Sequence, residues 1–181
     1  MATITIKNVD KLTRKLNQIA NMELDKAMND ALVIVHGHAK SNAPVNKGGG
    51  AGLSGSIHMS KRRTPNGLEG QVFTNLEYAP YVEFGTGIKG NGTYPYKIKG
   101  LNLSYRDTPW FIPAEEIDDK TAEKYHFIKI HGKDGADFYI CYGQPAHPFM
   151  YPALKDNEAL IIKKFNDRVK NELLNCCKGG K

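Results

Sequence analysis

One acidic side chain stands in an unusually apolar stretch of this sequence. Glu83 lies within Tyr81-Val-Glu-Phe84, directly before Gly-Thr-Gly. A carboxyl group among apolar side chains can serve as a general acid, which makes Glu83, working with a histidine, a candidate catalytic residue of a small hydrolase. We favour a structural role, because a lone carboxylate before glycines can accept hydrogen bonds from turn amides or pair with a neighbouring subunit's Arg or Lys.

The next residues contain a glycine pattern that binds dinucleotides in other proteins. Gly85-Thr-Gly-Ile-Lys-Gly90 matches this pattern letter for letter. The chemistry requires a strand before the glycines and a helix N-terminus after them, which receives the pyrophosphate. Here the sequence NGTYPYKIKG follows the pattern and favours turns and strands. We therefore expect no cofactor at these glycines.

Histidines and nucleophile motifs give no further catalytic or metal site. His36 and His38 are two residues apart on an expected helix, hence about 200° apart around its axis, and cannot share a metal ion as an i, i+4 pair would. His126, His131 and His147 are spread over expected strands and loops. Neither a GxxxxGK[ST] loop nor a GxSxG elbow is present. We expect no metal and no enzymatic activity.

Length and composition fit a soluble globular protein of one domain. The chain has 181 residues, of which 40% are hydrophobic and 24% charged. It lacks a run of ~18 apolar residues and the apolar core of a signal peptide, so we expect synthesis in the cytoplasm and no membrane partner. Three cysteines without a spaced framework argue against structural disulfides.

The net charge of +6 is dispersed along the chain, and Lys61-Arg62-Arg63 is its one basic run. Such a run is most simply a solvated strand end, which we favour. The alternative is a contact with phosphate or an acidic partner, as in a basic nucleic-acid-binding domain.

Helical periodicity marks both ends of the chain. After residues 2–7, which alternate like a strand or an extended arm, the pattern predicts a short helix from about Asp10 and a longer one ending near Asn42, with a break at Asn21. Pro152 suits the first turn of a final helix. The apolar face of that helix carries Leu154, Ile161, Phe165, Val169 and Leu173.

Strand patterns fill the middle of the chain. We expect one hairpin from 56–63 and 69–75, closed by Thr64-Pro-Asn-Gly67, and a second from 126–132 and 137–143. The sequence predicts a single α+β domain over 1–181, with an antiparallel sheet of about four strands packed by a long N-terminal helix and a C-terminal helix. A large loop insertion is expected at about 88–125.

Two short segments look like interaction surfaces. In YAPYVEFGTG, residues 78–87, the aromatic residues recur every three positions beside a glycine-rich reversal. In QPAHPFMYPAL, residues 144–154, three prolines fix φ and remove donors, so this arm is extended and cannot pair as an interior strand. Each segment can equally be core or connector packing, and the choice stays open.

Together with their neighbours, these segments resemble the head–tail connector family of long-tailed bacteriophages, the tail-completion proteins of the neck. The family pattern is Ala-Pro after a helix, a glycine-rich loop into a strand, an "N..YA..vEfGTg" motif, and a "G.pa.PFm.PAl" motif before an amphipathic helix. The matching residues are, in order, Ala43-Pro44, the loop 48–52, Leu53–Ile57, Asn75, Tyr78-Ala79, Glu83–Gly87 and Gln144–Leu154. The resemblance covers nearly the whole chain except about 88–135.

The resemblance implies a non-enzymatic virion protein that needs no cofactor. It would be assembled in the host cytoplasm as a ring of identical copies, expected to be six-fold. Its partners would be itself, the head-closure or connector proteins, and the tail terminator or tail-tube proteins, while the genome passes through the channel without sequence readout. The alternative in the same virion is a tail terminator or minor tail protein.

A closed ring requires two different patches on each copy. We expect the proline-rich arm or the insertion of one copy to meet residues 78–87 of the next, and a glycine loop to order on assembly. The expected interface residues are Tyr78, Tyr81, Glu83, Phe84, Gly85, Thr86, Gly87, Pro145, His147, Pro148, Phe149, Met150 and Pro152. The expected assembly loop contains Gly48, Gly49, Gly50 and Gly52.

Overall fold

The computed structural model describes residues 9–45, 52–65, 67–133 and 135–178, and these divide into two compact units. Unit 1 combines Met1–Thr74 with Met150–Lys181, and unit 2 is Asn75–Phe149. The segment 2–7, expected to be a strand or arm, lies outside the described residues. Within the described part, every helix is too short or too polar to cross a membrane.

Unit 1 is organised around one long helix, α1 (Val9–Asn42). Its buried side chains Ala27, Ala31, Val35 and Ala39 repeat every four residues and form a narrow stripe of mostly small residues. The helix ends where Pro44 disfavours helical backbone at the preceding residue. The expected break is wrong: α1 continues through Asn21, because asparagine inside a helix costs well under 1 kcal/mol and leaves the backbone hydrogen bonds intact.

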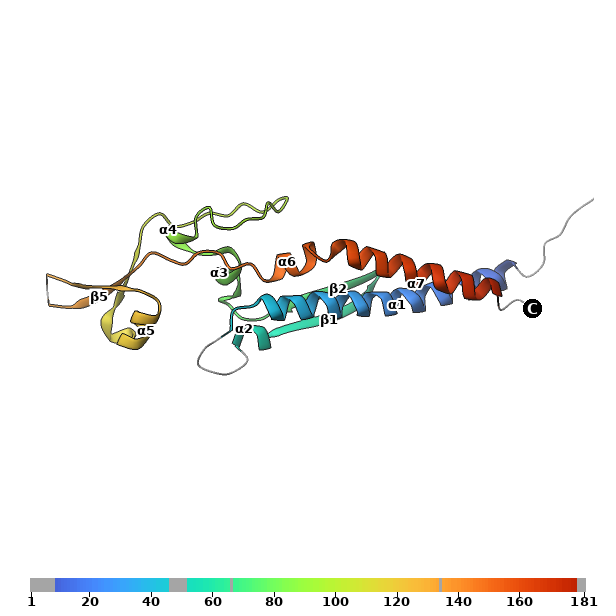
Figure 1. Ribbon diagram of the computed structural model, residues 1–181, viewed down its shortest axis with the longest axis horizontal. Helices are drawn as coiled ribbons and strands as arrows, with labels where there is room; N and C mark the ends of the chain where they lie inside the picture. The colour runs from blue at the N-terminus through green and yellow to red at the C-terminus, as the bar shows by residue number, and fades with distance from the viewer. Residues whose placement is uncertain (1–8, 46–51, 66, 134, 179–181) are drawn as a thin grey trace, which may run out of the picture. The chain divides into compact units, whose positions relative to one another are not determined.

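The first hairpin packs along α1 and confirms the expected pairing (Figure 1). Strand β1 (Ile57–Thr64) pairs antiparallel with β2 (Gly67–Thr74), with Thr64 opposite Gly67. The short helix α2 (Gly52–Gly55) precedes β1 and buries Leu53. Gly52, the last residue of the expected assembly loop, therefore opens a helix, whereas Gly48, Gly49 and Gly50 lie outside the described residues.

The C-terminal segment forms two helices where the periodicity predicts one. These are α6 (Met150–Lys155), with Pro152 in its first turn, and α7 (Glu158–Lys178), which packs on α1. The buried Asn157 separates them, and its side-chain amide donates to the Ala153 carbonyl at 2.9 Å. This bond replaces a helical backbone hydrogen bond, which explains how the chain turns without leaving a buried carbonyl unpaired.

Unit 2 contains a second, separate sheet. Its elements are α3 (Ala79–Phe84), α4 (Gly87–Gly90), β3 (Trp110–Pro113), η1 (Ala114–Glu116), α5 (Asp119–Lys124), β4 (Ile128–His131) and β5 (Asp137–Cys141). The strands are antiparallel in the order β3-β5-β4. The second hairpin, β4–β5, is confirmed, with Ile128 opposite Ile140 and Ile130 opposite Phe138.

The α+β class and its long terminal helices are confirmed, but within the described residues one sheet of about four strands is replaced by two sheets, of two and three strands. The reason is β3, which lies in the segment expected to be a loop and pairs with β5. The second hairpin therefore completes its own sheet. A single domain with an insertion at about 88–125 stays a prediction.

Candidate functional site

The two segments singled out from the sequence contact each other within unit 2. Thr86 and Gln144 form an antiparallel bridge, in which the Thr86 amide donates to the Gln144 carbonyl at 2.9 Å and the reverse bond is 3.1 Å. The Lys89 amide donates to the Tyr142 carbonyl at 3.0 Å. We call residues 81–90 together with 142–149 the clasp, since they join the start of unit 2 to its end.

Every backbone N–H between residues 144 and 149 is used in this contact. Beyond the Thr86–Gln144 bridge, the Ala146 amide donates to Thr93 Oγ1 at 2.8 Å and the His147 amide to the Val82 carbonyl at 2.8 Å. Pro145 and Pro148 carry no N–H. Over residues 144–149 the arm forms only an isolated bridge, as its prolines predict, whereas residues 150–154, also expected to be extended, belong to the helix α6. Because its donors are satisfied, it is held in one conformation.

Glu83 is the centre of the clasp and one of its buried polar residues. Its side chain is 5% exposed, and its Oε2 accepts the Phe149 amide at 2.7 Å. The Tyr94 hydroxyl donates to the other oxygen at 3.4 Å. Glu83 thus accepts a backbone amide, but this amide belongs to Phe149, 66 residues further along the chain, and not to the turn that follows Glu83. A charged acceptor strengthens such a bond.

The glycines of the dinucleotide pattern lie where their own backbone closely approaches the backbone of residues 142–146. A Cβ on Gly85 would come within 2.7 Å of the Ala146 nitrogen, and one on Gly87 within 2.7 Å of the Tyr142 carbonyl oxygen and 2.6 Å of the Trp110 ring. Helix α3 stands directly before Gly85, where nucleotide binding requires a strand. These glycines therefore serve close packing of the clasp.

Exposure divides the expected interface residues into three groups. Tyr78 and Tyr81 are 46% and 58% exposed, and Pro145 and His147 are also exposed. Buried residues are Glu83, Gly85, Gly87, Phe149 and Pro152, and partly buried ones are Phe84, Thr86, Pro148 and Met150. The aromatic face expected at 78–84 is divided, because Phe84 turns inward and packs edge-on against Tyr94 at 5.0 Å. The side chains most accessible to a partner are those of the first group.

Sequence reasoning missed several residues that complete the clasp. Thr93 and Tyr94 supply the hydrogen bonds described above, and the Tyr105 hydroxyl donates to the Phe84 carbonyl at 2.8 Å. Gly143, at φ +87°, would place a Cβ against the Thr86 carbonyl. All four lie outside the two motifs or carry no local pattern, and the one available signal was the density of Tyr and Gly in the supposed loop.

The basic run of β1 is matched by carboxylates. Alternation along the strand puts Lys61 and Arg63 on one face, where both pair with Asp25 of α1, the Lys61 bond measuring 3.1 Å. The hydrogen bond from Lys61 lowers the pKa of Asp25. On the other face, Arg62 pairs with Glu69 of β2 at 2.8 Å. These pairs support the solvated-strand interpretation over a nucleic-acid contact.

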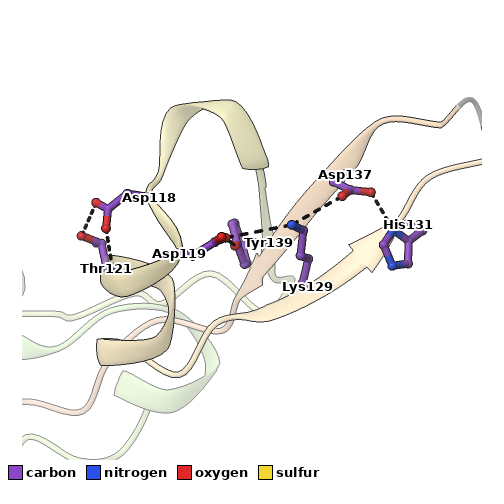
Figure 2. Close-up of polar contacts among 7 residues, drawn as sticks. All are labelled: Asp118, Asp119, Thr121, Lys129, His131, Asp137 and Tyr139. Atoms are coloured by element: carbon purple, nitrogen blue, oxygen red, sulfur yellow. Dashed lines mark hydrogen bonds and ion pairs between the residues drawn. The ribbon is translucent and has the colours of Figure 1, made fainter.

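A second polar cluster covers one face of the β3-β5-β4 sheet (Figure 2). Lys129 lies 3.5 Å from Asp137 and 4.0 Å from Asp119, and the Tyr139 hydroxyl donates to Asp119 at 2.6 Å. His131 shares a 2.6 Å hydrogen bond with Asp137, which lowers the pKa of that carboxyl. The opposite charges satisfy one another, which gives the cluster a structural role in joining α5 to the sheet.

The contact with Asp119 raises the pKa of Tyr139 above its usual 10.0. A raised folded-state pKa contributes stability that is complete below pH 10.0 and is lost as pH rises through the folded value. We expect Asp119→Asn to lower the pKa of Tyr139, measured by NMR titration of labelled tyrosine rings. Glu123→Gln, which removes an exposed charge on the same helix, is the control and should leave it unchanged; an unaltered Tyr139 in Asp119→Asn would contradict the assignment.

Two of the histidines contact oxygen acceptors of the protein itself. His36 Nε2 lies 3.0 Å from the Ile57 carbonyl oxygen, and His131 is engaged by Asp137. Within residues 9–45, 52–65, 67–133 and 135–178, no group of three His, Cys, Asp or Glu side chains could hold a metal ion.

Comparison with known protein families gives a match to part of the chain. Residues 5–85, less than half of the chain, match the family described as "Bacteriophage HK97-gp10, putative tail-component". No curated protein and no solved structure gives a significant match. The match agrees with the resemblance to phage head–tail proteins and supports a structural, phage tail-related protein located in a virion.

Proposed function

We propose that this chain, similar to a phage tail component over residues 5–85, is a tail-completion protein of the neck of a long-tailed phage. Identical copies form a ring, expected to be six-fold, between the head-closure proteins and the tail terminator. The ring surrounds the channel through which the genome passes, and it acts by binding rather than by catalysis.

The similarity to a tail component carries this proposal, and the clasp supports it. Residues 144–149 lie outside the matched segment, yet they bond to its last residues through Val82 and Glu83. The two motifs on which the family resemblance rests are therefore parts of one built structure. Because residues 144–149 use all of their backbone donors internally, the clasp offers a partner a fixed surface, and the expected interface residues exposed on or beside it are Tyr78, Tyr81, Pro145 and His147.

Antibody labelling of virions tests the location. Gold-labelled antibody against the purified protein should mark the junction between head and tail in electron micrographs of the phage that carries the gene. Label at the far end of the tail, or along it, would favour a minor tail protein. Label found only at the head-proximal end of isolated tails, which have not joined heads, would favour a tail terminator. Absence of the protein from purified virions would contradict the proposal.

Light scattering across protein concentrations, followed by images of any oligomer, tests the ring. The two alternatives from other functional classes, a hydrolase and a nucleic-acid-binding protein, predict different results. A hydrolase would lose activity in Glu83→Gln, and a nucleic-acid-binding protein would show tight, steeply salt-dependent binding to DNA. The internal pairing of Lys61, Arg62 and Arg63 leads us to expect weak DNA binding.

A further inference from the structure

One face of the β3-β5-β4 sheet consists of apolar side chains alone. The strand register places Phe111, Ile140 and Ile128 in one row across the three strands. The next row on the same face is Pro113, Phe138 and Ile130, because side chains two residues apart point the same way. The opposite face carries Lys129, His131, Asp137 and Tyr139, which are drawn in Figure 2. We call the two rows the apolar sheet face.

The apolar sheet face is open to solvent at its edges. Phe111 of β3 is 59% exposed and Ile128 of β4 is 55% exposed. A contiguous apolar surface of this kind on a soluble domain marks an interaction site more often than chance exposure of single residues does. Its chemistry requires a partner surface that is itself partly apolar.

Charge indicates which partner fits. Unit 2 contains 8 Lys and Arg against 10 Asp and Glu, whereas unit 1 contains 17 against 9. The formal charges are therefore −2 and +8, which together give the +6 of the chain. Glu115 and Glu116 end η1, the short helix that follows β3, and both are exposed. Pairing two apolar sheet faces would bring these glutamates of both copies together, whereas unit 1 of another copy attracts them.

Helix α7 in unit 1 presents a surface of the required chemistry. Its Ile161, Phe165 and Val169 side is partly buried, and Arg168 there pairs with Asp30 of α1 at 2.6 Å. At helical spacing, the outward stripe carries Leu160, Lys163, Lys164, Asp167, Lys170 and Leu174, all exposed. The stripe combines apolar side chains with an excess of positive charge.

We propose that the apolar sheet face of one copy docks on the outward stripe of α7 of a second copy, with Glu115 and Glu116 against Lys163 and Lys164. Two different patches on each copy make the contact heterologous, and a heterologous contact generates a ring when its rotation closes. This inference rests on the ring of the proposed function and specifies the two surfaces by which its copies would bind each other.

Self-association of the full chain tests this contact, measured by light scattering and sedimentation over a range of concentrations. Phe111→Ser and Lys163→Glu/Lys164→Glu should each weaken the association constant about tenfold or more. Val33→Ser is the matched control, because Val33 is 58% exposed on α1 and lies outside both surfaces. Circular dichroism should show that each variant is folded, as expected for exposed positions.

A charge exchange provides the decisive measurement. Glu115→Lys/Glu116→Lys should weaken association, and combining it with Lys163→Glu/Lys164→Glu should restore most of it. If Phe111→Ser weakens association while the charge variants do not, the sheet faces pair with each other and the proposed contact is wrong. If rings persist in Phe111→Ser, this contact is wrong and the ring stands. A wild-type chain that stays monomeric to about 1 mM also overturns the contact, whereas the neck location is decided separately by virion labelling.

Discussion

Replacing Glu83 with alanine should lower the free energy of unfolding of unit 2 by about 2 to 3 kcal/mol. The substitution removes a charged acceptor and leaves the Phe149 amide unsatisfied in a site where Phe149 is 1% exposed. Trp110, the single tryptophan, lies in β3 of unit 2, so denaturant unfolding followed by its fluorescence reports on this unit.

Two matched variants separate the hydrogen bond from other effects. Glu83→Gln keeps an acceptor of the same shape and should retain most of the stability, while Glu77→Ala removes an exposed acid nearby and should change it by less than about 0.5 kcal/mol. An unfolding curve for Glu83→Ala that coincides with the wild type would show that the clasp does not depend on this bond. A hydrolytic activity lost in a fully stable Glu83→Gln would instead return Glu83 to catalysis.

Gly87→Ala and Gly143→Ala should each destabilise unit 2 by about 3 kcal/mol or more. Both residues have positive φ, +60° and +87°, and the added Cβ would meet backbone: the Tyr142 carbonyl oxygen at 2.7 Å for Gly87, and the Thr86 carbonyl for Gly143. Backbone on both sides is fixed by the clasp hydrogen bonds, so neither partner can move aside. Gly87→Ala should also shift the emission of Trp110, whose ring lies 2.6 Å from the added atom.

Two glycines in other settings serve as controls. Gly92 has φ +74° but open space around it, so Gly92→Ala isolates the backbone strain, about 1 to 2 kcal/mol. Gly37 lies in α1 with open space and ordinary φ, and Gly37→Ala should stabilise unit 1 by roughly 0.5 to 1 kcal/mol. Equal losses at Gly87 and Gly92 would mean that the close approach contributes nothing.

Local patterns predicted those elements whose side chains repeat regularly. Both hairpins and the helical ends followed from alternation, turn residues and four-residue spacing. The helix break in the C-terminal segment was missed because it depends on Asn157 bonding to Ala153, which periodicity does not encode. Strand β3 was missed because its four residues, Trp-Phe-Ile-Pro, are too few to show alternation and end in a proline.

The candidate site was only half predictable for a similar reason. Both motifs were found from their own residue types, and Glu83 was expected to accept amide hydrogen bonds. That Phe149 supplies the amide, or that Thr93 receives the one from Ala146, depends on how distant segments meet. A single sequence carries no record of such pairs. A local pattern can also mislead: Gly85–Gly90 match the dinucleotide-binding pattern, but here these glycines are required by close backbone packing.

The clasp also sets the order in which the chain can fold. Glu83 accepts its hydrogen bond from Phe149, 66 residues further along the chain, and Asp30 of α1 pairs with Arg168, 138 residues further along. Contacts of such long sequence separation form after local hairpins and helices, because the intervening chain must first lose its freedom. During synthesis, neither unit can be completed until residues 142–178 have left the ribosome. Residues 142–178 therefore close both units, and a chain truncated before residue 142 should complete neither.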